Sequence, residues 1–175
     1  RRAVAAKAGQ WGDDSPFLVP ELDMLAHAAW SDGQAGLAAD TALRALPLAR
    51  AGGFEDATAL HNRQRSLADL QLMAGRLEAA LALYTALIPA ENDPAQHRRM
   101  VWEQAALLLR LSRSAELEQA RPGLEALLPQ DAAGLEELRN AAHWDQRLGN
   151  PALTVLKLQL ALARADQLRL KPDWQ

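Results

Sequence analysis

Apolar residues recur every three or four positions along most of this 175-residue chain, and single turn-forming residues interrupt the pattern at intervals. Between Leu67 and Pro89, the residues on both sides of Gly75 have this helical spacing. Glycine adopts a positive φ without a steric penalty, so Gly75 suits the end of the first helix. The segment therefore predicts two amphipathic helices joined by a tight turn, with Pro89 closing the second.

The same arrangement recurs along the chain. Turns are expected at Gly33, Gly75 and Gly149, and in the Ser-Arg-Ser stretch that begins at Ser112. These turn residues, at positions 33, 75, 112 and 149, are 42, 37 and 37 residues apart. A recurring interval of this size is typical of helical repeat proteins.

Helix starts and stops agree with this reading. Asp93 and Asn150 each offer a capping side chain before a proline at the first helical position. Pro122 is expected to kink or end its helix, because proline cannot donate the intrahelical hydrogen bond. We therefore predict an all-α chain with eight main helices in four antiparallel pairs. The approximate repeats are 16–50, 54–90, 93–129 and 131–170 of one array over residues 1–175.

Composition narrows the class of protein. Hydrophobic residues make up 49% of the chain, mostly Ala and Leu, which suits close helix packing better than a sheet. The net charge of −3 predicts no nucleic-acid partner. No apolar run reaches the ~20 residues of a membrane span, so we expect this segment not to be membrane-inserted. The opening "RRAVAAKAG" is read as the end of an earlier repeat in a longer protein, whose membrane association is left open.

The second repeat resembles the tetratricopeptide repeat. Leu67-Ala68, Gly75, Ala80 and Tyr84 fit the spacing of that family's pattern. The first and fourth repeats fit more loosely, and the first-helix tyrosine of the family is absent from all three. The resemblance implies a right-handed α-solenoid in which small residues lie where paired helices cross. These residues are Ala26, Ala38, Ala68, Ala80 and Ala142. An armadillo- or HEAT-like stack is the structural alternative.

In the family, the first helix of each pair lines a concave groove that binds protein partners. Carried onto this chain, the resemblance implies a set of lining residues three to thirteen positions before each turn. The predicted groove residues are Asp23, His27, Trp30, Asn62, Arg65, Asp69, Arg99, Trp102, Glu136, Arg139, His143 and Gln146. Arg65, Trp102 and Arg139 stand at the same repeat position and are predicted to form a stripe that docks a partner.

Catalytic and metal chemistry is not predicted. The four histidines lack the spacing of a zinc site, and no phosphate-binding glycine loop is present. The stretch "GGFED" at 52–56 is read as a turn into a helix. We therefore expect no enzyme activity, no metal and no cofactor. The tryptophans have two open readings, as core between helices or as a binding surface.

The function expected from the resemblance is a non-catalytic protein–protein interaction scaffold. Long degenerate arrays of this kind resemble the periplasmic part of bacterial exopolysaccharide-export proteins. A cytoplasmic array in a bacterial signalling or transcription regulator is one alternative. Direct binding of an anionic or sugar polymer is another.

Overall fold

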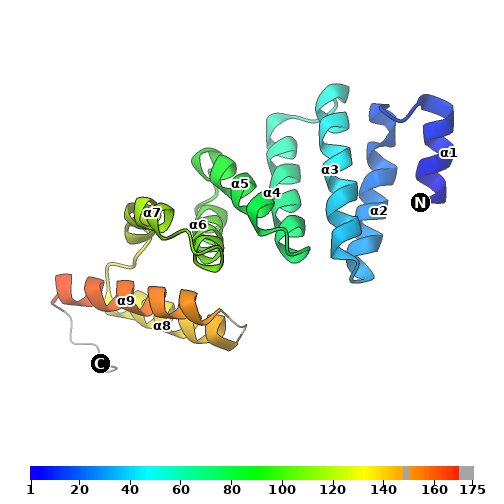
Figure 1. The fold of residues 1–175 in the computed structure, drawn as a ribbon. Helices are drawn as coiled ribbons and strands as arrows, with labels where there is room; N and C mark the ends of the chain where they lie inside the picture. The colour runs from blue at the N-terminus through cyan, green and yellow to red at the C-terminus, as the bar shows by residue number, and fades with distance from the viewer. Residues whose placement is uncertain (148–149, 170–175) are drawn as a thin grey trace. The chain divides into compact units, whose positions relative to one another are not determined.

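The computed structural model describes residues 1–147 and 150–169, and all regular secondary structure in these residues is helical. This confirms the predicted all-α class. The α-helices (Figure 1) are α1 (Arg2–Trp11), α2 (Val19–Ser31), α3 (Ala35–Gly52), α4 (Ala57–Met73), α5 (Leu77–Leu87), α6 (Pro94–Arg110), α7 (Ser114–Ala126), α8 (Ala132–Arg147) and α9 (Pro151–Gln167). Two short 3₁₀ helices, η1 (Pro16–Leu18) and η2 (Ile88–Ala90), precede α2 and follow α5. The chain divides into two compact units, residues 1–90 and 91–175.

At the first three predicted turns, three-residue connections join successive helices and share one hydrogen-bond pattern. Gly33 and Gly75 have φ of 72° and 73°. At the second turn the Gly75 amide donates to Leu72, and the next amide, that of Arg76, donates to Gln71. This pair of bonds is the Schellman motif, which satisfies the last carbonyls of a helix. The positions of these two turn glycines are therefore confirmed.

The third turn has the same geometry without a glycine. Ser112 has a φ of 56°, its amide donates to Leu109, and the Arg113 amide donates to Leu108. At the fourth turn the Asn150 amide donates to Asp145, which is the corresponding longer bond. The predicted turn residue Gly149 lies outside the described residues.

Helix ends follow the sequence signals with two exceptions. The Asp93 carboxylate accepts bonds from the Ala95 and Gln96 amides, as predicted for a capping residue. Asn150 precedes α9, but its side chain makes no capping bond, so that prediction was wrong. Pro122 does not end α7, which continues to Ala126. Burial of Leu124 two residues later offsets the missing backbone bond, since apolar burial favours the continued helix.

In residues 1–90 the helices pack in chain order, with α2 against α3, α3 against α4, and α4 against α5 (Figure 1). The predicted small residues of these helices are buried, and Ala38, Ala68 and Ala80 are fully so. Short side chains let the helix axes approach closely, which explains alanine there. Around α1, η1 and α2 a separate apolar cluster forms, which includes Val4, Leu18 and Ala45 of α3.

In residues 91–175, α6 packs on α7 and α8 packs on α9. Here α9 also contacts α6. The predicted small residue Ala142 is fully buried, and the Thr154 hydroxyl of α9 donates to its carbonyl at 2.9 Å. Leu135 of α8 and Ala161 of α9 complete the buried seam between these two helices.

Candidate functional site

The predicted groove residues of α2 and α4 lie at the surface of unit 1–90 but differ in how they are engaged. His27, Trp30 and Asn62 are exposed, and the indole of Trp30 retains 48% of its accessible surface. The rings of His27 and Trp30 meet edge to face with centroids 6.2 Å apart. Trp30 is therefore not part of the interhelix core, and its place in a binding surface stays a prediction.

Asp23, Arg65 and Asp69 are half-buried. The Tyr84 hydroxyl of α5 donates to the Asp69 carboxylate at 2.5 Å. Tyr84 is fully buried, so this bond satisfies its hydroxyl within the α4–α5 hairpin. Asp69 thus has a structural task in addition to its predicted place in the groove.

Helices α6, α8 and α9 bring together a cluster that the sequence did not predict. Lys157 of α9 retains only 8% of its accessible surface. Its ammonium group lies 2.6 Å from the Asp145 carboxylate and 5.0 Å from the centre of the Trp102 ring. A buried ammonium needs such a partner, since burial of an unpaired charge is costly. The half-buried Trp102 therefore has a packing role against α9. The signal for this cluster in the sequence was Lys157, the one charged residue in the mostly apolar stretch 152–163.

The remaining predicted residues of unit 91–175 lie at the surface or partly covered. Arg99 is exposed and its Nε donates to Gln96 at 3.3 Å. Arg139 is half-buried and forms an ion pair with Glu136 one turn earlier on α8. His143 and Gln146 are exposed. Near them the indole of Trp144 is 61% exposed, and Arg147 lies 5.2 Å from its ring centre. The stripe of Arg65, Trp102 and Arg139 draws on both units and stays a prediction.

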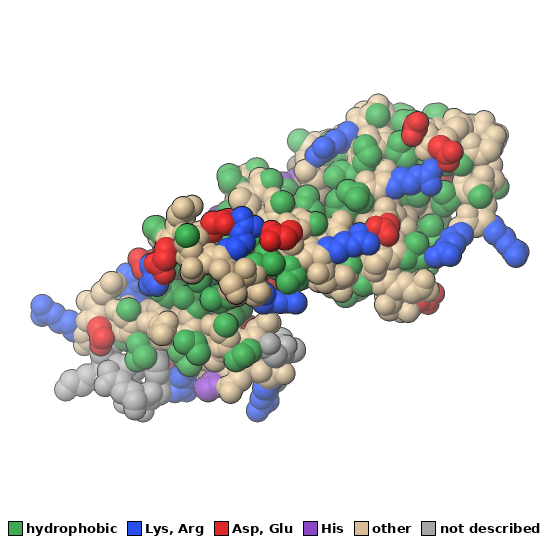
Figure 2. All heavy atoms as spheres, viewed as in Figure 1, with side chains coloured by type: hydrophobic (Ala, Val, Ile, Leu, Met, Phe, Trp, Pro, Cys, Tyr) green, Lys and Arg blue, Asp and Glu red, His purple; other side chains and the backbone are tan. Residues whose placement is uncertain are grey.

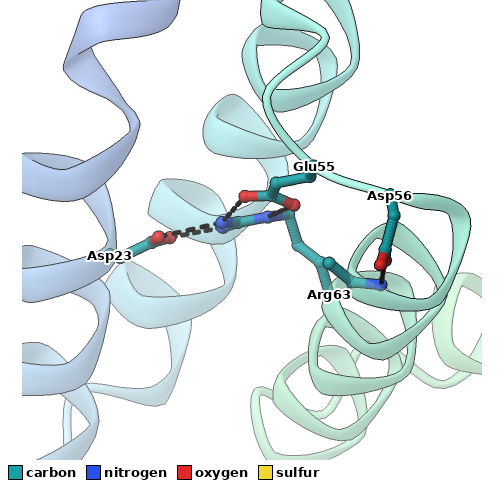
Figure 3. Close-up of polar contacts among 5 residues, drawn as sticks. Asp23, Glu55, Asp56 and Arg63 are labelled. Carbon is teal, nitrogen blue, oxygen red and sulfur yellow. Dashed lines mark hydrogen bonds and ion pairs between the residues drawn. The ribbon is translucent and has the colours of Figure 1, made fainter.

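One arginine links α2, α4 and the α3–α4 loop (Figure 3). Both terminal nitrogens of Arg63 donate to the Asp23 carboxylate, at 2.5 and 3.0 Å. The Arg63 Nε donates to Glu55 Oε2 at 3.0 Å, and Nη2 also bonds this carboxylate. The Arg63 side chain is 18% exposed. The sequence prediction placed Asn62 and Arg65 in the groove but missed Arg63 between them.

Arg63, Asp23 and Glu55 form a charged triad in which the ion pairs stabilise the ionised forms of the side chains. Hydrogen bonds from Arg63 lower the pKa of Glu55, although partial burial opposes the shift. The hydrogen bonds that Arg63 donates to Glu55 and Asp23 raise the pKa of Arg63. Two carboxylates share one guanidinium, so the ionised triad carries a net charge of −1.

Beside the triad, an apolar pocket of about 270 Å³ opens between η1 and the α3–α4 loop. Its lining residues are Pro16, Phe17, Val19, Pro20, Ala49, Phe54 and Glu55. Phe17 is 57% exposed and Phe54 is 73% exposed. Their ring centroids lie 5.9 Å apart, and the Trp11 ring lies 5.5 Å beyond Phe17. The stretch 52–56 is thus more than the simple turn predicted from the sequence, because it supplies one wall of this pocket.

Local backbone features hold the pocket in place. The Asp56 carboxylate accepts the Ala59 amide and begins α4 directly after Glu55 (Figure 3). Before η1, Arg44 Nη2 donates to the backbone carbonyl and the carboxylate of Asp13, at 3.1 and 3.0 Å. This pair ties the connection before η1 to α3.

No group of three or more histidine, aspartate or glutamate side chains in residues 1–147 and 150–169 could hold a metal ion. Within the same residues, no helix combines the length and the apolar character needed to cross a bilayer. The face drawn in Figure 2 mixes acidic and basic side chains among hydrophobic ones.

No protein-family model matches the chain, and no characterised protein has a significantly similar sequence.

Proposed function

We propose that this chain is a non-catalytic protein-interaction scaffold built as a right-handed, tetratricopeptide-like α-solenoid of about four helix pairs. The repeated Schellman turns and the buried alanines at corresponding repeat positions support a repeat architecture. Stacked helix pairs have little interior and instead present an extended surface, which is why such arrays bind other proteins.

The observation that carries the interaction role is the exposure of Trp30 on the face of α2 that was predicted to line the groove. Tryptophan is among the residues enriched in the energetic centres of protein interfaces. His27 contacts the indole, so the two rings form one surface with an apolar part and a polar part.

For the parent protein, we propose the periplasmic region of a bacterial exopolysaccharide-secretion protein, on the resemblance alone. A cytoplasmic regulator is the alternative for the compartment. Binding of an anionic or sugar polymer is a second candidate function. The exposed Trp144 beside Arg147 favours it, since an aromatic face next to a cation suits a polyanionic glycan.

The test is selection from a library of random linear peptides displayed on phage, with the whole chain as bait. Peptides that are enriched are then measured by titration calorimetry. Trp30→Ala should weaken the binding of a groove peptide by tenfold or more, in line with an interface centre. The control is Trp144→Ala, an equally large exposed truncation on α8, which should leave that affinity unchanged.

A library that yields no binder, or binders indifferent to Trp30→Ala, would contradict the groove proposal. Titration with alginate and with an uncharged glucan tests the polymer alternative. Binding of alginate that is lost in Trp144→Ala would favour that alternative over the scaffold.

A further inference from the structure

We propose that the pocket between η1 and the α3–α4 loop is a second docking site, outside the predicted groove. It receives a peptide segment that carries one aromatic or branched apolar side chain next to a lysine or arginine. This inference rests on the proposed function, because it specifies the chemistry of one partner segment.

The size and lining of the pocket suit one side chain. Its volume of about 270 Å³ is just below the roughly 300–1,000 Å³ of sites that enclose whole small molecules. The walls are two phenylalanines, two prolines and two aliphatic residues, with Glu55 as the charged lining residue. An apolar side chain in this space would cover part of Phe54, whose ring is otherwise 73% exposed. Such burial of apolar surface is the main favourable contribution to docking.

The ring geometry disfavours a cage for a lone cation. Phe17 and Phe54 contact each other at 5.9 Å with their planes tilted by 32°, so they form a continuous surface. A cage needs aromatic faces on several sides of the cation, each within about 6 Å. The surface that Phe17, Phe54 and Trp11 present instead suits a flat or branched apolar group.

The surrounding charge specifies the neighbour of that apolar group. Residues 12–18 and 53–56, which carry the two phenylalanines, contain Asp13, Asp14, Glu55 and Asp56 and no basic residue. Arg44 pairs with Asp13, and Arg63 is shared by Glu55 and Asp23. Lys7, over the Trp11 ring, pairs with Glu21, and Arg50 in the last turn of α3 is exposed. The acidic excess beside the pocket complements a cationic residue in the bound segment.

The same charges argue against other occupants. Exposed aromatic loops can enter a lipid surface, but acidic residues beside them repel the anionic lipids that strengthen such binding. A second copy of the chain placed symmetrically on this surface would bring its acidic residues against their equivalents. Charge complementarity therefore selects a basic and apolar peptide.

The experiment is a titration of the isotopically labelled chain, followed by NMR, with three blocked pentapeptides. The probes are Gly-Arg-Phe-Arg-Gly, the same peptide with Ala for Phe, and the same peptide with Glu for both Arg. The first should shift the amide signals of residues 17–19 and 52–56. Its dissociation constant should be about tenfold lower than that of either other peptide.

Variants locate the site. Phe54→Ala should raise the dissociation constant of the first peptide about tenfold, and Phe17→Ala provides an independent second test. Glu55→Gln should raise the dissociation constant of the basic peptide several-fold and reduce the difference in affinity between the basic and the acidic peptide. Trp144→Ala is the matched control and should leave the dissociation constant of the first peptide unchanged. Circular dichroism of each variant checks that it is folded.

Several results would overturn the inference. Among them are equal binding of the basic and acidic peptides, and binding of the basic peptide that both phenylalanine variants leave intact. Equal shifts of these signals by tetramethylammonium alone would indicate a site for a lone cation. Loss of binding to phosphatidylserine vesicles in the phenylalanine variants would indicate a lipid surface, and loss of dimerisation would indicate a second copy of the chain. A chain that binds library peptides in the groove but not the basic peptide would disprove this inference and leave the scaffold proposal standing.

Discussion

Gly52, the last residue of α3, lies at the closest approach between the two walls of the aromatic pocket. A Cβ atom at this position would lie 2.8 Å from the Phe54 ring and 2.9 Å from the Pro16 ring. Gly36 in the same helix has far more room, since its nearest outside atom, on Arg76, would be 3.9 Å away. The two glycines therefore differ in what a methyl group would cost.

Gly36→Ala should raise the free energy of unfolding by about 0.5 kcal/mol, because alanine is favoured over glycine in helices. Gly52→Ala should leave the free energy of unfolding unchanged or lower it, because Phe54 or Pro16 must move to make room for the methyl group. Urea unfolding of both variants measures the difference. Equal gains for both would show that the pocket wall yields freely at residue 52.

The Arg63 triad predicts a pH dependence. The pKa of Glu55 is lowered in the folded state, so its ionisation stabilises the protein above the unfolded pKa of about 4.3. That contribution is lost as the pH falls through the lowered folded pKa. Glu55→Gln should lower the free energy of unfolding by about 1–2 kcal/mol at pH 7 and by progressively less below pH 4.

Glu116→Gln is the control for this series. Glu116 pairs with Arg113 on the surface of α7, where both side chains are more exposed. Exposed pairs contribute about 0–1 kcal/mol, so its effect should be smaller throughout. If Glu55→Gln were as mild as Glu116→Gln at pH 7, the triad would have no special stabilising role.

At the scale of the elements, the turn is the unit that repeats. Two turns use glycine at the left-handed position, and the third uses Ser112 with a φ of 56°. Non-glycine residues pay a steric cost of about 1–2 kcal/mol in this region.

Ser112→Gly should therefore stabilise the chain by about 1 kcal/mol, and Gly75→Ala should destabilise it by a similar amount. Ser66→Gly, in the exposed middle of α4, is the control and should destabilise. Thermal melting of the three variants is the measurement. A loss of stability in Ser112→Gly would mean that its side chain compensates for the turn geometry.

The crossing of paired helices is the second element-scale feature. Ala80 of α5 is fully buried, whereas Ala82 on the same helix is exposed. Ala80→Trp should overpack the seam and cost at least about 1–3 kcal/mol. Ala82→Trp should be nearly neutral. Similar melting temperatures for the two variants would contradict the close approach of α4 and α5 at residue 80.

At the scale of the whole molecule, residues 1–90 form a compact unit with their own buried core. A chain ending at Ala90 should therefore remain helical and unfold cooperatively. A chain ending at Asp56 lacks α4 and α5, including Leu60, which packs on the α1–α3 cluster. It should lose cooperative unfolding. Circular dichroism during thermal unfolding compares the two, and a disordered 1–90 chain would contradict the division.

Much of the helical pattern could be predicted from the sequence, because helical periodicity, capping aspartates and left-handed glycines act within a few residues of the chain. Gly33, Gly75 and Asp93 illustrate this local determination. The buried alanines were expected from the resemblance to the tetratricopeptide pattern once the turns were placed. Pro122 shows the limit, since tertiary burial of Leu124 decided whether the helix continued.

The candidate sites depended on contacts between residues far apart in the chain, which periodicity does not encode. Asp23 and Arg63 are 40 residues apart, and Phe17 and Phe54 are 37 residues apart. Lys157 belongs to an apolar helical run, and only its approach to Asp145 and Trp102 explains a buried ammonium. The sequence by itself determined the all-α class and the repeated turns, because those depend on local backbone preferences. Tertiary structure alone decided which charged and aromatic side chains meet, because packing brings together surfaces that separate helices carry.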